Sequence, residues 1–236
     1  MFDVQKTTLL LGRKDCNYSQ ALLDVLQSQG FHITHYFFGG REDVFPRELL
    51  AWRGDYVFSF RCPVKIPEVP LKNTNLAAIN IHPATPDYCG SGGINWALYD
   101  GAEQFGVTIH LINTQIYAGP IIERQRMPVE TSDDIASLWP KINHMAFEMA
   151  SNRIKNIALF GMPFIEQCMQ KNHHEKWTGK LRKMHEIDQL ENISLDCSIE
   201  EFNRIKKATS FAGFGPYIIL HGHKFRLVDD CGCLDD

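Results

Sequence analysis

The chain has 236 residues, 44% of them hydrophobic and 22% charged, so it can bury the core of one domain plus a small addition and is neither disordered nor fibrous. Its 24 Lys and Arg residues against 28 Asp and Glu residues leave a net charge of −4, and we expect no nucleic-acid partner. No stretch approaches the roughly 20 apolar residues that span a bilayer, and the first residues lack a signal-peptide core. We therefore expect a cytoplasmic protein with no membrane contact.

The seven cysteines are an odd number and show neither a disulfide framework nor the spacing of a zinc site. Cys231 and Cys233 are separated by one glycine, but no histidine is suitably placed to complete a metal site with them. We interpret the cysteines as free thiols and expect no bound metal.

Apolar runs and helical periodicity alternate along the first half of the chain. Strands are expected at 7–11, 31–38, 55–60, 76–81 and 106–112, and helices at 19–29, 46–52 and 94–100. This alternation predicts an α/β domain whose mostly parallel sheet is covered by helices on both faces. Such sheets bind ligands beyond the carboxyl ends of their strands.

The second half predicts a long helix followed by a smaller unit. Thr131 is the expected N-cap of a helix that ends at Gly161 and is kinked or started by Pro140. A polar, irregular arm is expected over 167–186, a helix over 198–208, and two strands at 215–220 and 224–228. We therefore divide the chain into an α/β domain, 1–160, and an arm with a small helix-and-hairpin appendage, 161–236.

The most informative residues are Asn80 and His82, at the end of an expected strand that Pro83 terminates. Side chains two residues apart share one face of a strand, so the amide and the imidazole project together at the carboxyl edge of the sheet. An amide that donates to a developing oxyanion beside an imidazole that moves protons suits acyl transfer. The same residues could instead satisfy backbone groups of nearby loops.

Three blocks, at 80–90, 105–110 and 119–122, resemble the folate-dependent formyltransferase family over roughly residues 55–125. This family includes glycinamide ribonucleotide, methionyl-tRNA and sugar N-formyltransferases. The resemblance implies a Rossmann-like domain and transfer of a formyl group from N10-formyltetrahydrofolate to an amine. By motif, Asn80 resembles the family's oxyanion-stabilising asparagine, and His82 resembles its proton-transferring histidine.

The resemblance also implies two folate-lining loops. The candidate folate-binding residues are Pro63, Val64, Lys65, Ile66, Asn113, Ile116 and Gly119.

One catalytic position departs from the family pattern. The family's aspartate, in an Asp-x-Gly motif, stands here as Tyr117 in Tyr117-Ala118-Gly119. A phenol with an ordinary pKa near 10 is a poor base at neutral pH, and losing a general base typically costs on the order of 10²- to 10⁴-fold in rate. Asp87 and Asp100 are candidate replacements. The alternative is a catalytically impaired homologue that still binds folate or a nucleotide.

The acceptor is chosen among three branches of the family. The loop 11–17 lacks the second glycine of a phosphate-binding nest, which disfavours glycinamide ribonucleotide. Only 76 residues follow Phe160 and the chain is acidic, which disfavours a methionyl-tRNA enzyme, although that reading stays open. The nucleotide-sugar branch, which acts on dTDP-4-amino-4,6-dideoxyhexoses and often dimerises through a short appendage, fits best.

Three further side chains are candidates for contacting this acceptor. His110 lies on an expected strand that could line the site, whereas Trp177 and Phe214 could stack on a base. Each could equally be a packing residue. The expected partners are a small nucleotide-sugar substrate and a second copy bound through the appendage.

Overall fold

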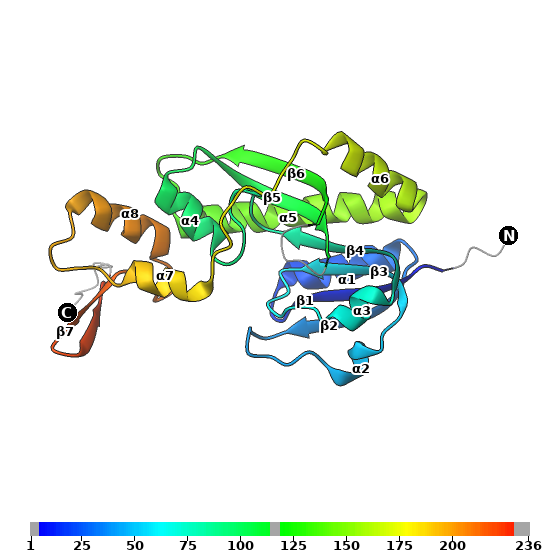
Figure 1. Ribbon diagram of the computed structural model, residues 1–236, viewed down its shortest axis with the longest axis horizontal. Helices are drawn as coiled ribbons and strands as arrows, with labels where there is room; N and C mark the ends of the chain where they lie inside the picture. The colour runs from blue at the N-terminus through cyan, green and yellow to red at the C-terminus, as the bar shows by residue number, and fades with distance from the viewer. Residues whose placement is uncertain (1–4, 114–118, 229–236) are drawn as a thin grey trace, which may run out of the picture.

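The computed structural model describes residues 5–113 and 119–228 and contains a six-stranded sheet of order β2-β1-β3-β4-β5-β6 (Figure 1). The strands are β1 (Thr7–Arg13), β2 (His32–Phe38), β3 (Gly54–Phe60), β4 (Thr74–His82), β5 (Gln104–Leu111) and β6 (Ile121–Pro128). Strands β1 to β4 are parallel, while β5 is antiparallel to both of its neighbours. The predicted α/β, Rossmann-like, mostly parallel sheet is confirmed.

Helices cover both faces of this sheet. The helices of the sheet domain are α1 (Asn17–Ser28), α2 (Arg47–Leu50), α3 (Glu68–Lys72), α4 (Gly93–Asp100), α5 (Ile135–Phe160) and α6 (Met162–Lys171). Apolar residues of α1, α4 and α5 pack in the core of one face, and those of α2 and α3 in the core of the other. This two-sided burial explains why the inner strands read as continuous apolar runs.

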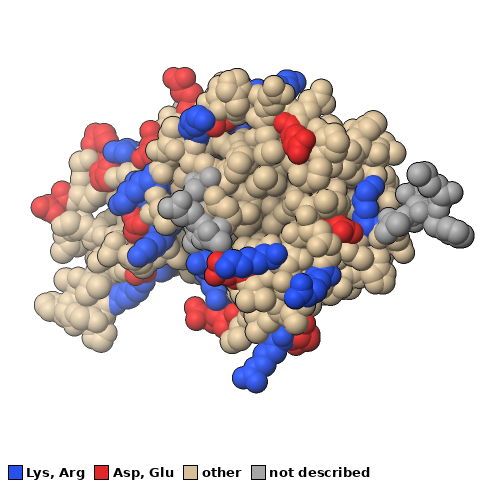
Figure 2. Space-filling model, turned by 45° about the vertical axis from the view of Figure 1, so that its right-hand side comes forward, with Lys and Arg blue, Asp and Glu red and all other residues tan. Residues whose placement is uncertain are grey.

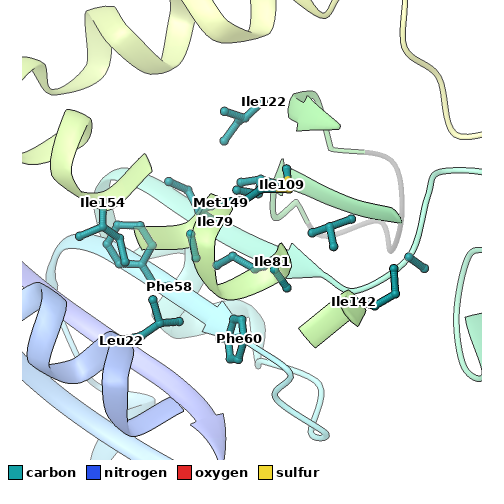
Figure 3. Close-up of a cluster of buried hydrophobic side chains, with 14 of the residues drawn as sticks. Leu22, Phe58, Phe60, Ile79, Ile81, Ile109, Ile122, Ile142, Met149 and Ile154 are labelled. Atoms are coloured by element: carbon teal, nitrogen blue, oxygen red, sulfur yellow. The ribbon is translucent and has the colours of Figure 1, made fainter. Parts of the chain in front are cut away.

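The larger core lies between the sheet and α1 and α5. Phe58, Ile79 and Ile81 from the strands meet Leu22 and Ile154 from the helices, and all five are at most 2% exposed (Figure 3). Because alternate strand residues face opposite sides, Ile79 and Ile81 point into this core, which directs Asn80 and His82 to the other side.

Helix α5 begins later than the sequence suggested. The N-cap is Asp134 rather than Thr131, because the Asp134 carboxylate accepts a hydrogen bond from the Ser137 backbone while the Ser137 hydroxyl accepts from the Asp134 backbone. Pro140 lies inside the helix, where it neither starts nor ends it.

The carboxyl-terminal part contains α7 (Met184–Glu191), α8 (Ile199–Thr209) and an antiparallel hairpin, β7 (Tyr217–Leu220) and β8 (His223–Arg226). This confirms the predicted helix and hairpin. Helix α8 packs on α4, with the Tyr99 hydroxyl donating to Glu201 at 2.6 Å and the Asn95 amide to the Ala208 carbonyl at 2.8 Å.

Four elements were not predicted: α3, β6, α6 and α7. Helix α6 carries the fully buried Ile165 into the larger core, so the irregular segment expected from residue 167 starts only after Lys171. Helix α3 has five residues and α7 has eight, which is too short for a repeated apolar face to reveal them. Within the two described ranges, no helix combines the length and apolarity needed to cross a membrane.

Candidate active site

Strand β4 ends at His82 and pairs with β5 so that Asn80 lies opposite His110. The predicted placement of Asn80 and His82 at the carboxyl end of a central strand is therefore confirmed. His82 and His110 are both buried, at 7% and 5% exposure, and Asn80 is partly exposed. The strand pairing brings together three polar side chains from two strands.

The orientation of the Asn80 amide is fixed by His110. His110 Nδ1 lies 2.8 Å from the carbonyl oxygen of Leu111, and a carbonyl can only accept, so Nδ1 carries the proton. His110 Nε2 is then the acceptor for Asn80 Nδ2 at 3.1 Å. One N–H of Asn80 is thus held by the imidazole, and its amide carries a second N–H for a ligand.

His82 is a neutral imidazole at physiological pH. Its Nε2 donates to the Tyr88 carbonyl at 3.2 Å, which makes Nδ1 the acceptor nitrogen of the neutral ring. Burial, followed by the proximity of His110, lowers the pKa of His82 to about 4 against the opposing hydrogen bond to Tyr88. Burial likewise lowers the pKa of His110 to about 4. Both rings can accept a proton and bind it weakly.

Trp177 packs against both histidine rings. Its ring centroid lies 4.8 Å from that of His110, edge to face, and 6.2 Å from that of His82. The indole Nε1 donates to the Gly119 carbonyl at 2.9 Å. In the segment after α6, Trp177 thus supports the histidines by packing and does not itself line the cleft described below.

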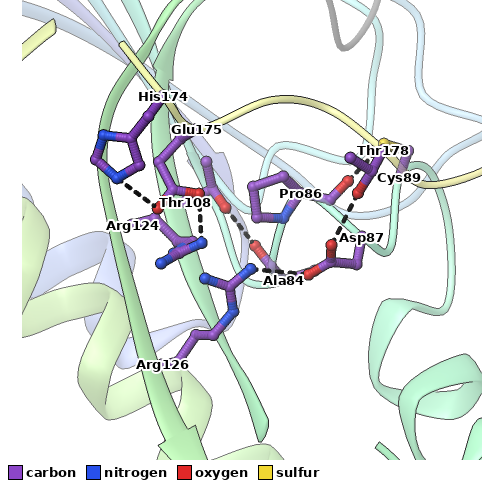
Figure 4. A network of polar contacts seen from close by, with 10 residues as sticks. All are labelled: Ala84, Pro86, Asp87, Cys89, Thr108, Arg124, Arg126, His174, Glu175 and Thr178. Carbon is purple, nitrogen blue, oxygen red and sulfur yellow. Dashed lines mark hydrogen bonds and ion pairs between the residues drawn. The ribbon is translucent and has the colours of Figure 1, made fainter. Parts of the chain in front are cut away.

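Ion pairs fasten this segment to the sheet (Figure 4). Asp87 accepts from Arg126 on β6 at 3.0 Å and from Thr178 at 2.8 Å, while Glu175 pairs with Arg124 of the same strand. The hydrogen bonds from Thr178 and Arg126 outweigh burial and lower the pKa of Asp87. The Asp87 carboxylate is therefore occupied by its bonds to Arg126 and Thr178, which hold the fold together.

A cleft of about 1350 Å³ opens where β3 and β4 end, and Asn80, His82 and His110 all line it. Of the candidate folate-binding residues, Pro63, Val64, Lys65, Ile66 and Asn113 also line it. Gly119 is buried beside Trp177 and does not line it, whereas Ile116 and Tyr117 lie outside the described residues. The structure therefore brings one proposed folate loop close to Asn80 and His82.

The described lining of the cleft is basic although the chain is acidic. Its basic side chains are Arg13, Arg41, Arg61, Lys65, Arg182 and Lys183, and its acidic side chains are Glu42 and Glu68. In the view of Figure 2, Lys and Arg are interspersed with Asp and Glu over the surface. This lining favours an anionic ligand.

Three sequence candidates lie away from the cleft. Asp87 and Asp100, considered as replacements for the family aspartate, do not line it. Phe214 is 65% exposed and faces Arg226 of the hairpin, with the guanidinium 5.8 Å from its ring centre. We therefore assign neither a base nor a stacking role to these residues.

The sequence analysis missed three cleft residues: Arg61, Trp139 and Asn143. Arg61 directly follows β3, and this position at the carboxyl end of a strand could have singled it out. Trp139 and Asn143 are four residues apart on α5, in a pattern indistinguishable from ordinary core packing.

The cysteines that the structure describes are free thiols, and the described residues contain no cluster of His, Cys, Asp or Glu that could hold a metal. Cys231 and Cys233 lie outside the described residues.

The fold and site define an α/β protein with an amide and an imidazole at the carboxyl end of a central strand, beside a basic cleft. Residues 41–154, just under half of the chain, match the family model described as formyl transferase. The family resemblance inferred from the three motif blocks is confirmed.

Curated relatives support this assignment at low identity. A methionyl-tRNA formyltransferase from Bacteroides fragilis is 29% identical over 181 residues, which cover 75% of this chain and 52% of that protein. One from Lactobacillus acidophilus is 22% identical, over 76% of this chain and 55% of that protein. The chain spans about half the length of these relatives.

Solved structures share the fold over nearly the whole chain. A sugar N-formyltransferase from Shewanella sp. has a TM-score of 0.68 at 17% identity, covering 94% of this chain and 96% of that one. A 4-N formyltransferase from Francisella tularensis has a TM-score of 0.69 at 17% identity, covering 94% and 97%. The formyltransferase PseJ from Anoxybacillus kamchatkensis, solved with UDP-4,6-dideoxy-4-formamido-L-AltNAc and tetrahydrofolate, has a TM-score of 0.59 at 18% identity, covering 83% and 96%.

Proposed function

We propose that this protein transfers a formyl group from N10-formyltetrahydrofolate to the amine of a nucleotide-linked amino-deoxysugar of the dTDP-4-amino-4,6-dideoxyhexose type. The observation that carries the proposal is the Asn80 amide, held by His110 beside the neutral ring of His82 in a basic cleft. Formyl transfer needs a hydrogen-bond donor for an oxyanion and a group that moves a proton, and these residues supply both.

The cleft fits the folate donor on one side. Val64, Ile66, Leu71 and Ile112 form an apolar wall that belongs to the smaller core cluster, and a flat heteroaromatic ring can pack against it. Lys65 at this wall suits the carboxylates of a folate tail. Bound there, the donor supplies an activated formyl carbon.

Asn80 and His82 then have different roles in the transfer. The N–H of Asn80 that is not held by His110 stabilises the negative charge that develops on the formyl oxygen. His82 Nδ1 accepts a proton from the attacking amine, and the low pKa of His82 makes the resulting imidazolium a ready acid for the departing nitrogen. Burial beside Trp177 keeps the ring neutral until the reaction needs it.

The nucleotide-sugar acceptor is favoured over methionyl-tRNA by two observations. Solved structures described as a sugar N-formyltransferase and a 4-N formyltransferase share the fold over 94% of the chain, and the similar formyltransferase PseJ was solved with a UDP-linked formamido sugar. The described cleft lining has six basic side chains against two acidic ones, which suits a small anion better than an extended RNA backbone. A tRNA acceptor would instead require salt-dependent tRNA binding, which a filter-binding assay at low salt detects.

A second candidate function follows from Tyr117. No described cleft carboxylate lies on the strands that carry Asn80 and His110, so a folate- and nucleotide-binding homologue with impaired catalysis is the alternative. Tyr117→Asp discriminates the two. A rate gain on the order of 10²-fold or more indicates an impaired site, and no gain or a loss indicates that the native tyrosine serves the reaction.

We also propose a homodimer formed through the hairpin. Tyr217 and Arg226 face α7, where Arg226 pairs with Glu191 at 3.0 Å. On the other face, Phe225 and Leu220 are 53% and 40% exposed, which suits a self-complementary apolar contact. Light scattering should show a dimer that Phe225→Asp converts to a monomer, and a wild-type monomer would refute this proposal.

The function is tested by supplying the folate donor with a panel of dTDP- and UDP-linked amino-sugars and measuring formyl product by mass spectrometry. We expect product with at least one sugar amine and none with the matching hydroxyl sugar. Formyl transfer to methionyl-tRNA but to no sugar would show that the acceptor is methionyl-tRNA and not a nucleotide-linked sugar.

A further inference from the structure

The cleft has two apolar walls that belong to opposite faces of the sheet. Val64 and Leu71 extend the core cluster under α2 and α3, whereas Ile94 and Ile142 extend the cluster under α4 and α5. The ends of β3 and β4, which carry Arg61 and Asn80, lie between the two walls. Under the proposed function the folate donor takes the first wall, so the second remains for the acceptor.

Arg61 places a cation beside this second wall, and the described residues offer it no acidic partner. Its Nη1 donates to Cys16 Sγ at 3.4 Å, and among the described residues no carboxylate forms an ion pair with it. Burial and then the charge of Arg13 lower the pKa of Arg61 against the opposing effect of Cys16, and Arg13 also lines the cleft. Two neighbouring guanidinium groups without an acid suit a diphosphate.

The backbone at Arg61 supports a ligand role. Its φ is +53°, a conformation that a residue with a long side chain rarely adopts. Such strain concentrates at ligand-binding positions, where surrounding structure holds it. Arg61 directly follows β3, and its guanidinium lies over the Trp139 ring, 4.7 Å from the ring centre.

Asn143 adds a buried hydrogen-bond acceptor that no described residue donates to. Its side chain is 3% exposed and lines the cleft, and its Nδ2 donates to the Trp139 carbonyl at 2.7 Å. Its Oδ1 has no hydrogen-bond partner among the described residues. A buried, unsatisfied acceptor is costly, and a ligand with a hydroxyl or N–H group would satisfy it.

We propose that Arg61, Trp139 and Asn143 form the subsite for the nucleotide-sugar acceptor. Arg61 with Arg13 holds the diphosphate, Asn143 Oδ1 accepts from a donor group of the same ligand, and Trp139 provides flat apolar surface for its ring. This subsite rests on the proposed function for the identity of the ligand, whereas its anion-binding chemistry rests on the side chains alone.

Calorimetric titration of the intact chain with dTDP, UDP and 5-formyltetrahydrofolate tests the subsite. Arg61→Gln should weaken nucleotide binding at least tenfold, Arg61→Lys should weaken it less, and both should change 5-formyltetrahydrofolate binding less than twofold. Trp139→Leu should weaken nucleotide binding about tenfold and Asn143→Ala about threefold, again with less than a twofold change in 5-formyltetrahydrofolate binding. Arg47→Gln, which removes an equal charge from exposed α2, should change neither ligand.

Circular dichroism confirms that each variant is folded. Three results would overturn the subsite. Arg61→Gln could weaken the binding of both ligands equally, or weaken only the binding of 5-formyltetrahydrofolate. The wild type could also fail to bind either nucleotide. If nucleotide binding depends on Arg61 but no formyl transfer to any amine occurs, the proposed function fails and the subsite stands. If transfer occurs but Arg61→Gln raises only the donor KM, the function stands and the subsite fails.

Discussion

Asn80 donates its side-chain amide to Nε2 of His110 at 3.1 Å, across the antiparallel pair of β4 and β5. The Leu111 carbonyl fixes the tautomer of His110, so a backbone group determines how the amide is oriented. The amide is therefore held before any substrate binds, which is the condition for stabilising an oxyanion without reorganisation.

Asn80→Ala removes the proposed oxyanion donor. We expect kcat to fall by about 10²- to 10³-fold, because this is the usual effect of deleting one such donor, with a small change in either KM. Steady-state kinetics with the folate donor measures it, and Asn203→Ala on the exposed side of α8 serves as the control. A change confined to KM would assign Asn80 to binding.

His110→Phe keeps a ring in place but removes the acceptor that holds Asn80. We expect kcat to fall about tenfold, and we expect the same change to have no further effect in an Asn80→Ala background. The double-mutant cycle separates positioning from a general packing defect. Additive losses in the double variant would show that His110 acts independently of Asn80.

Two buried histidines should make the protein unstable in acid. His82 and His110 have pKa values of about 4 in the fold, against about 6.5 in an unfolded chain, so the unfolded state binds more protons between these values. The free energy of unfolding should therefore fall as the pH drops from 7 toward 4, by up to about 1.4 kcal/mol per pH unit per histidine.

Urea denaturation at pH 7 and pH 5 measures this difference. It should shrink in His110→Gln and persist in the control His185→Gln, whose imidazole is exposed on α7. Identical stability of the wild type at the two pH values would show that the buried rings are not held neutral.

Trp177 should protect the histidines from water. Trp177→Ala is expected to lower stability by about 2 kcal/mol, because the half-buried indole contacts both rings and bonds to Gly119. It should also raise the pKa of His82 toward its ordinary value, and NMR titration of the ring follows this. Trp177→Phe retains the ring contact and should retain the low pKa; a His82 pKa unaltered in both variants would remove the shielding role.

The sequence predicted the mostly parallel sheet and the position of Asn80 and His82 on it because both depend on local periodicity. Alternation along β4 placed Ile79 and Ile81 inside and Asn80 and His82 at the cleft, and the fold preserves that placement. The pairing of Asn80 with His110 depends on the register between β4 and β5, which cannot be read from the sequence across a separation of 30 residues.

Other features depended on tertiary contacts alone. For Trp177 the sequence allowed either packing or stacking on a base, and the structure packs it against the histidines from a segment with no regular pattern. The start of α5 was misplaced because Thr131 and Asp134 are both good N-caps, and only the reciprocal bonds with Ser137 select Asp134. Arg61 gained its significance from a positive φ and from Trp139, 78 residues away.

The most direct test of the account follows tetrahydrofolate release from N10-formyltetrahydrofolate in the presence of a dTDP-4-amino-4,6-dideoxyhexose. The account predicts release that requires the sugar amine, is matched by formylated sugar, and falls at least a hundredfold in Asn80→Ala and in His82→Gln. Release that does not require the amine, or amine-dependent transfer that both variants retain at the wild-type rate, would contradict it.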